Sequence, residues 1–200
     1  MSILKTLAIT LTIASVALLS SCAKVERIDA DSTTDLSGKW NDTDSRLVAD
    51  EMINDCMNRP WLNKMSGELG RNPTVIVGSV RNKSHEHISV ETFTKDMERA
   101  LINSGVVDFV ANASQRSELR AEVEQQQGNA TEETRKETNM ETGADLMLTG
   151  SINTIVDQED GKQVIFYQVD LELIDLQSQK KVWIGDKKIK KLLTRKNVKF

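Results

Sequence analysis

The sequence predicts an α+β domain in which helices pack mainly on one face of a mixed, five-stranded sheet. Three observations support this fold class: a strand–helix–strand pattern in mid-chain, three β-rich segments near the end, and a helical segment before both. Strand–helix–strand units join parallel strands, whereas strands joined by short turns pair antiparallel. A sheet built from both connections is mixed, and helices must cover its apolar face.

An amphipathic helix is predicted before the first strand. Its apolar residues recur every three or four positions: Val48, Ala49, Met52, Ile53, Cys56 and Met57. Either Thr43 or Asp44 is a suitable N-cap, and Pro60 marks the end of the helix. Residues 59–73 then form a loop with a short helical turn at residues 62–65.

The strand–helix–strand pattern occupies residues 74–110. Residues 74–80 are rich in β-branched side chains and predict a buried strand. Ser89 is placed to cap the helix that follows, and Gly105 stands where a left-handed residue ends a helix. Residues 106–110 give the second strand, parallel to the first. The apolar face of this helix is formed by Val90, Phe93, Met97, Ala100 and Leu101.

The C-terminal half begins with polar segments and ends in strands. Residues 114–127 predict a helix with a narrow apolar stripe, and residues 131–141 form at most an exposed helix. Three strands follow, at residues 145–156, 163–176 and 181–189, and we expect them to pair as an antiparallel meander. The middle strand alternates, with Ile165, Tyr167, Val169, Leu171 and Leu173 on one face.

The amino terminus has the pattern of an export signal. Lys5 precedes an apolar run over residues 7–19, and small residues then lead to a cysteine. This run is shorter than the ~20 residues that a permanent membrane span requires. The sequence Leu19-Ser20-Ser21-Cys22 resembles the lipobox of bacterial lipoproteins. That resemblance implies cleavage between Ser21 and Cys22 and attachment of acyl chains, such as palmitate, at Cys22.

These features divide the chain into three predicted parts. Residues 1–21 are the signal peptide, residues 22–44 are the lipidated cysteine and a tether, and residues 45–200 are a single domain. The tether contains no proline, and a coil of about 22 residues spans only ~26 Å on average. More than one acyl chain makes anchoring in a membrane stable.

The composition excludes several classes of function. A net charge of −4 gives no case for nucleic-acid binding. With Cys22 acylated, Cys56 is the one remaining thiol, so we expect no internal disulfide. Cys56 lies on an apolar helical stripe, where thiols are usually inert. The sequence has neither a Gly-x-Ser-x-Gly elbow nor a glycine-rich phosphate loop. We therefore expect no enzymatic activity and no cofactor.

The two histidines, His85 and His87, lie two residues apart, a spacing found in some zinc sites. Glu86 or Glu91 is available as a third ligand, but no further histidine or cysteine cluster completes a tetrahedral set. A solvated loop between a strand and a helix is the favoured interpretation, so no metal is expected.

Trp40 and Trp61 flank the first helix outside its apolar stripe and are the candidates for partner binding. Aromatic residues are enriched at interfaces, but tryptophans also hold loops on a domain, and both interpretations stay open. Trp183 is expected in the core. Basic residues near the C-terminus either protect an edge strand or contact anionic lipid or an acidic partner; they are Lys187, Lys188, Lys190, Lys191, Arg195, Lys196 and Lys199.

Four stretches carry a family resemblance through their order and spacing. They are residues 77–82 (VGSVRN), 93–101 (FTKDMERAL), 143–151 (GADLMLTGS), and 173–176 (LIDL) with 182–185 (VWIG). Together with the lipobox, they resemble the LpoB family of lipoproteins, the penicillin-binding protein activators. The resemblance implies a fold similar to the N-terminal domain of TolB. It also implies a class A penicillin-binding protein as partner, whose peptidoglycan synthesis is stimulated without catalysis by the lipoprotein itself.

The resemblance further implies a location at the cell wall. Ala23, directly after the lipidated cysteine, resembles outer-membrane sorting, so we expect an outer-membrane lipoprotein whose domain faces the periplasm. Family activators carry a long proline-rich tether, whereas the tether here is short and keeps the domain near its own membrane. The alternative function is a structural or assembly lipoprotein of an outer-membrane complex, with another envelope protein as partner. An envelope hydrolase is a third hypothesis.

Overall fold

The computed structural model of the chain describes residues 25–194. The predicted signal peptide, the Ser21–Cys22 cleavage site and the basic residues after position 194 lie outside the described residues. The chain divides into two compact units, residues 1–33 and 34–200, and the fold reported below belongs to the second. Within the described residues, no helix is long and apolar enough to cross a membrane.

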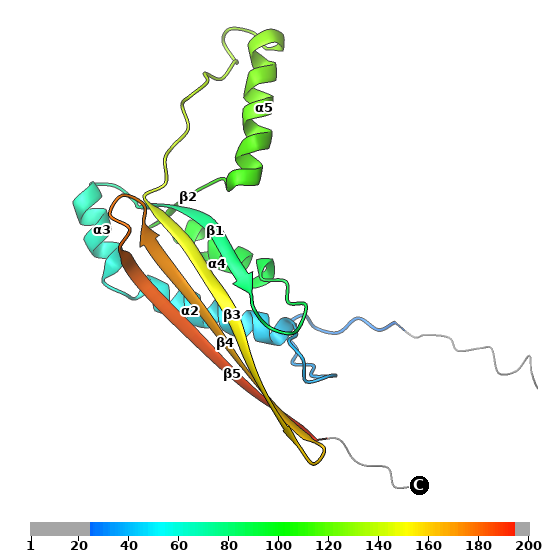
Figure 1. The fold of residues 1–200 in the computed structure, drawn as a ribbon. Helices are drawn as coiled ribbons and strands as arrows, with labels where there is room; N and C mark the ends of the chain where they lie inside the picture. Colours follow the sequence, from blue (N-terminus) through cyan, green and yellow to red (C-terminus); the bar gives the residue numbers. More distant parts are fainter. Residues whose placement is uncertain (1–24, 195–200) are drawn as a thin grey trace, which may run out of the picture. The chain divides into compact units, whose positions relative to one another are not determined.

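A five-stranded mixed sheet forms the centre of this unit (Figure 1). Its strands are β1 (Thr74–Asn82), β2 (Asp108–Val110), β3 (Leu146–Glu159), β4 (Lys162–Asp175) and β5 (Lys181–Thr194), in the spatial order β2-β1-β3-β4-β5. The first three positions in this order pair in parallel, and β3, β4 and β5 pair antiparallel. The predicted crossover and the predicted meander are therefore both confirmed.

Four helices accompany the sheet in the described part of the chain: α2 (Asp42–Met57), α3 (Trp61–Leu69), α4 (Glu91–Asn103) and α5 (Ala113–Asn129). α2 and α4 lie together on one face of the sheet (Figure 1). This arrangement confirms the predicted fold class. The likeness to the N-terminal domain of TolB stays a prediction.

The core lies between this helix pair and the inner face of β4. The alternation predicted for β4 is confirmed, because all five side chains are buried: Ile165, Tyr167, Val169, Leu171 and Leu173. Phe93, Met97 and Leu101 of α4 pack against them from the helix layer, together with Val48 and Met52 of α2. The turn between β3 and β4 consists of Asp160 and Gly161, both with positive φ, as hairpins with two-residue loops require.

The predicted N-cap of α2 is wrong. Thr43 and Asp44 lie inside the first turn, and the cap is Asn41. The Asn41 side chain accepts a hydrogen bond from the Asp44 N–H, and the Asp44 side chain accepts one from the Asn41 N–H. This reciprocal pair is a capping box, in which the residue at the third helical position takes part. Asp44 therefore lies at the predicted end of the helix, but it is the third helical residue and not the N-cap.

Two further local expectations need correction. The predicted turn at residues 62–65 is the nine-residue helix α3. Ser89 does not cap α4, because Val90 already has helical backbone angles and is the N-cap, without a side-chain cap bond. The polar residues 131–141 contain turns and no helix, which is compatible with the prediction of at most an exposed helix. Gly105, by contrast, has φ of 71° directly after α4, as expected of a left-handed helix end.

Asp145 joins the start of β1 to the start of β3. Its carboxylate accepts two hydrogen bonds from the Arg71 guanidinium, at 2.7 and 2.8 Å, and one from the Thr74 N–H at 2.8 Å. The hydrogen bonds from Arg71 lower the pKa of Asp145; burial opposes this effect, and the Thr74 N–H reinforces it. The carboxylate therefore stabilises the parallel pair of strands in its charged form.

We expect Asp145→Asn to lower the free energy of unfolding by about 1–3 kcal/mol at pH 7. Because the folded-state pKa is lowered, this contribution is present at neutral pH and is lost as the pH falls below about 4 through the folded value. Urea unfolding at pH 7, 5 and 2.5 measures it. The exposed substitution Asp50→Asn is the control. A difference between wild type and Asp145→Asn that does not shrink in acid contradicts the explanation.

Gly150 allows β3 and β4 to approach closely. A Cβ atom at this position would collide with the backbone oxygen of Asp170 and would lie 2.6 Å from Cδ2 of Leu171. Gly150 pairs with Leu171 in the ladder, so a methyl group there must displace backbone rather than a flexible side chain. The glycine is therefore required by packing.

We expect Gly150→Ala to destabilise the domain by about 1–3 kcal/mol through overpacking. The matched control is Gly67→Ala in α3, where nothing lies within 4 Å of an added Cβ. Alanine favours a helix over glycine, so the control should be neutral or stabilising. Thermal unfolding followed by circular dichroism compares the two, and equal melting temperatures would refute the packing argument.

Candidate interaction surfaces

Residues 34–41, here called the strap, are fastened to the domain through Trp40. The indole ring of Trp40 lies 6.5 Å from the ring of Phe93 and 5.4 Å from that of Tyr167, centroid to centroid. Its Nε1 donates a hydrogen bond of 2.9 Å to Ser45 Oγ. Such tilted and edge-on contacts are the arrangements that aromatic pairs prefer. Trp40 thus packs against both the helix layer and β4.

Glu86 holds the strap from the loop between β1 and α4. Its Oε2 accepts a hydrogen bond of 3.0 Å from the Trp40 N–H, and its Oε1 accepts one of 2.7 Å from the Tyr167 hydroxyl. Burial, and then the hydrogen bond to Glu86, raises the pKa of Tyr167. The carboxylate of Glu86, which the sequence offered as a third metal ligand, is thus used in hydrogen bonds. No metal-binding group of three His, Cys, Asp or Glu occurs among the described residues.

Lys191 of β5 also holds the strap against the domain. Its Nζ lies 2.6 Å from Asp44 Oδ2 and 3.1 Å from Asp35 Oδ1, and donates a hydrogen bond of 3.0 Å to the Lys39 carbonyl. The Lys191 side chain is only 13% exposed. Burial lowers the pKa of Lys191, but the hydrogen bonds to Asp44 and Asp35 outweigh this effect, so the pKa is raised. The sequence groups Lys191 with the basic residues near the C-terminus. In the structure its side chain is mostly buried and pairs with two carboxylates.

Trp61 and Trp183 both donate hydrogen bonds to residues near the end of α2. Trp61 is 6% exposed, and its Nε1 donates a hydrogen bond of 2.8 Å to the Cys56 carbonyl. Trp183 is buried, as predicted, and donates one of 2.8 Å to Asp55 Oδ2. Trp61 is therefore internal and Trp40 half-buried. A partner-binding role for these two tryptophans stays a prediction.

Cys56 is fully buried in the core. Burial, followed by the charge of Asp55, raises its pKa to about 12. The thiol is therefore protonated at neutral pH, and only the thiolate acts as a nucleophile. The geometry gives Cys56 a packing role.

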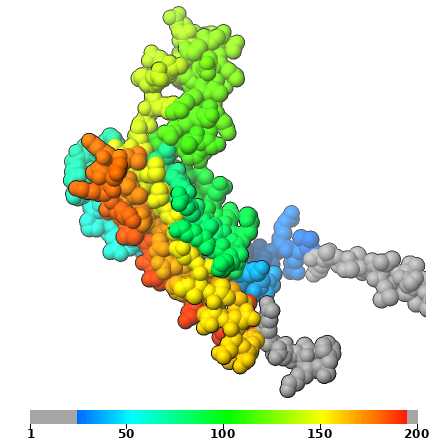
Figure 2. All heavy atoms as spheres, in the orientation of Figure 1, coloured from blue at the N-terminus to red at the C-terminus, as the bar shows by residue number. Residues whose placement is uncertain are grey.

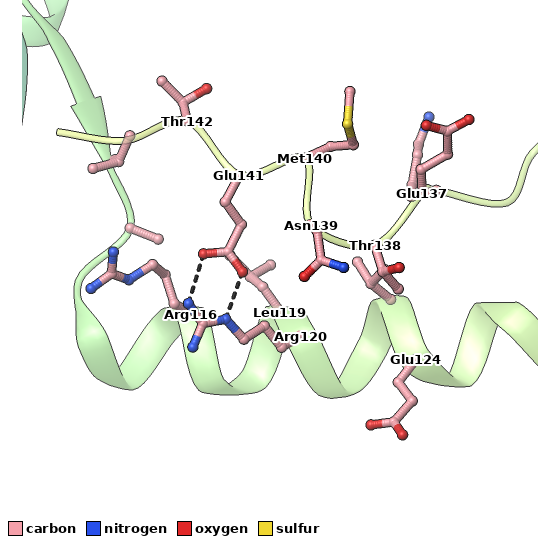
Figure 3. A pocket seen from close by; sticks show the side chains of 14 residues that line it. Arg116, Leu119, Arg120, Glu124, Glu137, Thr138, Asn139, Met140, Glu141 and Thr142 are labelled. Atoms are coloured by element: carbon pink, nitrogen blue, oxygen red, sulfur yellow. Dashed lines mark hydrogen bonds and ion pairs between the residues drawn. The ribbon is translucent and has the colours of Figure 1, made fainter.

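A second surface is a groove beside α5, here called the α5 groove (Figure 3). It is formed by residues 110–111, by one side of α5 and by the returning segment 136–142, and it encloses about 720 Å³. The returning segment lies against α5 in the space-filling view (Figure 2). The sequence predicts the exposed helix and the polar segment after it, but no local pattern indicates the groove between them.

Polar contacts hold the α5 groove together. The Arg120 guanidinium donates two hydrogen bonds to the Glu141 carboxylate, at 2.5 and 2.8 Å (Figure 3). Farther along α5, Gln127 Nε2 donates one of 2.7 Å to the Lys136 carbonyl. α5 itself has a capping box between Asn112 and Gln115. None of its residues is buried, so the helix is held by its own cap and by these surface bonds.

The chain matches the model of a known protein family. The family model described as "Peptidoglycan-synthase activator LpoB" matches residues 44–189. The chain belongs to the LpoB family. The match includes all five strands except the end of β5, and it includes α5 and its groove. The resemblance noted from the sequence is thereby confirmed. No curated protein sequence matches the chain.

Solved structures of similar proteins include LpoB domains. The C-terminal domain of LpoB from Salmonella enterica is 19% identical, with a TM-score of 0.34, over 65% of this chain and 93% of that one. The same domain from Escherichia coli is 18% identical, with a TM-score of 0.32, over 68% and 100%. A lipoprotein from Neisseria meningitidis is 13% identical, with a TM-score of 0.38, over 63% and 88%.

For the strap, we expect Lys191→Met to lower the free energy of unfolding by about 2 kcal/mol, because it leaves the buried Asp44 carboxylate without its cation. Trypsin should also cleave faster after Lys39, since local opening of the strap becomes easier. Urea unfolding and timed proteolysis measure the two effects. The neighbouring exposed substitution Lys190→Met is the control, and equal effects of both substitutions would contradict the assignment.

Proposed function

We propose that this protein is a lipid-anchored accessory protein of the outer membrane that binds and activates a class A penicillin-binding protein. Membership of the LpoB family over residues 44–189 carries the proposal. The protein acts by contact and catalyses no reaction. The exported and acylated amino terminus expected from Cys22 provides the anchor, and the domain faces the periplasm.

The chemistry of the described residues supports a role in binding. The side chains with strongly raised pKa values, Cys56 and Tyr167, are each occupied by packing or by a structural hydrogen bond. The carboxylate that bonds Tyr167 also holds the strap. Perturbed pKa values often mark active sites, but here each perturbation has a structural partner.

The strap limits how far the domain reaches from its anchor. Asp35 is bonded to Lys191, so residues 22–35 at most separate the lipid expected at Cys22 from the bonded part of the domain. Thirteen residues extend at most ~44 Å at ~3.4 Å each. The synthase must therefore approach the membrane that holds this lipoprotein, and the domain meets it close to that surface.

Activation is tested with a purified class A penicillin-binding protein and its lipid-linked substrate. The purified full-length chain should raise the rate of glycan polymerisation several-fold and should be recovered with the synthase in a pull-down. Heat-unfolded chain is the control. Micromolar folded chain that neither binds nor stimulates any class A synthase of its own organism would reject the proposed function.

Anchoring is tested separately by Cys22→Ser. We expect the wild-type chain to fractionate with outer membranes, and the variant to lose both acylation, read by mass spectrometry, and membrane association. Cys56→Ala is the matched control, because it removes the other cysteine and leaves the lipobox intact. A Cys22→Ser chain that stays with the membrane would contradict lipid anchoring.

A further inference from the structure

Two apolar side chains in the groove beside α5 are largely exposed. Leu119 is 55% exposed and Met140 is 73% exposed, and both line the α5 groove. A second hollow on the opposite side of Leu119 includes Ile102 of α4 and Phe109 of β2. Helices in proteins are stabilised mainly by packing of an apolar face, which α5 does not achieve within this chain. Contiguous exposed apolar side chains of this kind mark sites of contact with other proteins.

Both hollows adjoin the terminal strand of the sheet. Val110 and Ala111, at the end of β2, line both hollows. β2 is the terminal strand in the sheet order and pairs with β1 alone. An extended segment can add to such an edge through backbone hydrogen bonds, while its side chains enter the hollows on either side.

Charge distinguishes the two sides of α5. The α5 groove is lined by three basic side chains, Arg116, Arg120 and Lys136, and by three acidic ones, Glu124, Glu137 and Glu141. Arg116 Nε is shielded from solvent and has no hydrogen-bond partner within the described residues, although the charge of Arg116 acts on Glu141. Its neighbour Arg120 is already bonded to Glu141. The second hollow is instead lined by carboxylates, those of Glu98, Glu118 and Glu122. An unsatisfied buried donor requires an acceptor, and a carboxylate gives a guanidinium its strongest hydrogen bonds.

We propose that the α5 groove is the docking site for an extended segment of the synthase, which adds to the edge of β2. This segment carries an acidic side chain that bonds Arg116, and apolar side chains that cover Leu119 and Met140. The inference rests on the proposed function, because the synthase is the occupant. Docking also orders α5, which holds its place through surface bonds in the free protein.

Binding of purified full-length chain in detergent to an immobilised class A penicillin-binding protein tests the proposal. Leu119→Asp and Arg116→Glu should each weaken binding at least tenfold. The matched controls are Leu192→Asp, at a residue 67% exposed on β5, and Lys190→Glu, beside it. Both controls should bind as the wild type does. Circular dichroism checks that each variant is folded, which is expected because α5 buries no residue.

The outcomes separate this inference from the function it rests on. If the wild type binds the synthase and the groove variants bind equally well, or the β5 controls weaken binding as much, the docking site is refuted and the function stands. If the wild type binds no synthase, the function itself fails, and the docking site with it. Hydrogen exchange on the wild-type complex is a second measurement. New protection should appear in α5 and β2, and protection confined to other elements would overturn the proposal.

Discussion

The inner face of β4 is the constraint on which the rest of the domain depends. Five apolar side chains alternate along this strand, and β3 and β5 pair with it along almost all of its length. A slip of one residue would turn all five toward solvent, so the register is strongly specified. The strap depends on the same face, because Tyr167 contacts Trp40 through its ring and Glu86 through its hydroxyl.

α5 is stabilised differently, because none of its residues is buried. Its stability comes from local features, a capping box at Asn112 and surface bonds to the segment that follows it. Elements with few buried contacts open at low free-energy cost, so α5 adjusts to a partner without disturbing the sheet. A sheet with a well-packed core and a loosely attached helix fits the proposed role in binding a synthase.

The strap also bears on the proposed membrane anchoring. Residues predicted as tether are partly bound to the domain, through Asp35, Trp40 and the cation of Lys191. The ion pair between Asp35 and Lys191 stabilises the fold and, under the proposed lipid anchoring, also shortens the segment between the domain and Cys22. Under the proposed function, this short segment places contact with a synthase close to the membrane.

The sequence by itself determined the order of the elements, the mixed sheet and the face of β4, because periodicity and turn residues act within a few positions along the chain. It also carried the lipobox and the family resemblance. It misplaced the caps of α2 and α4, since several nearby polar residues were suitable and only the backbone angles decide between them. Only the tertiary structure brings together Tyr167 and Glu86, which are 81 residues apart in the sequence. The same holds for Lys191 and Asp35, which are 156 residues apart. The tertiary structure alone formed the α5 groove, because contacts between distant residues depend on the folded path of the whole chain.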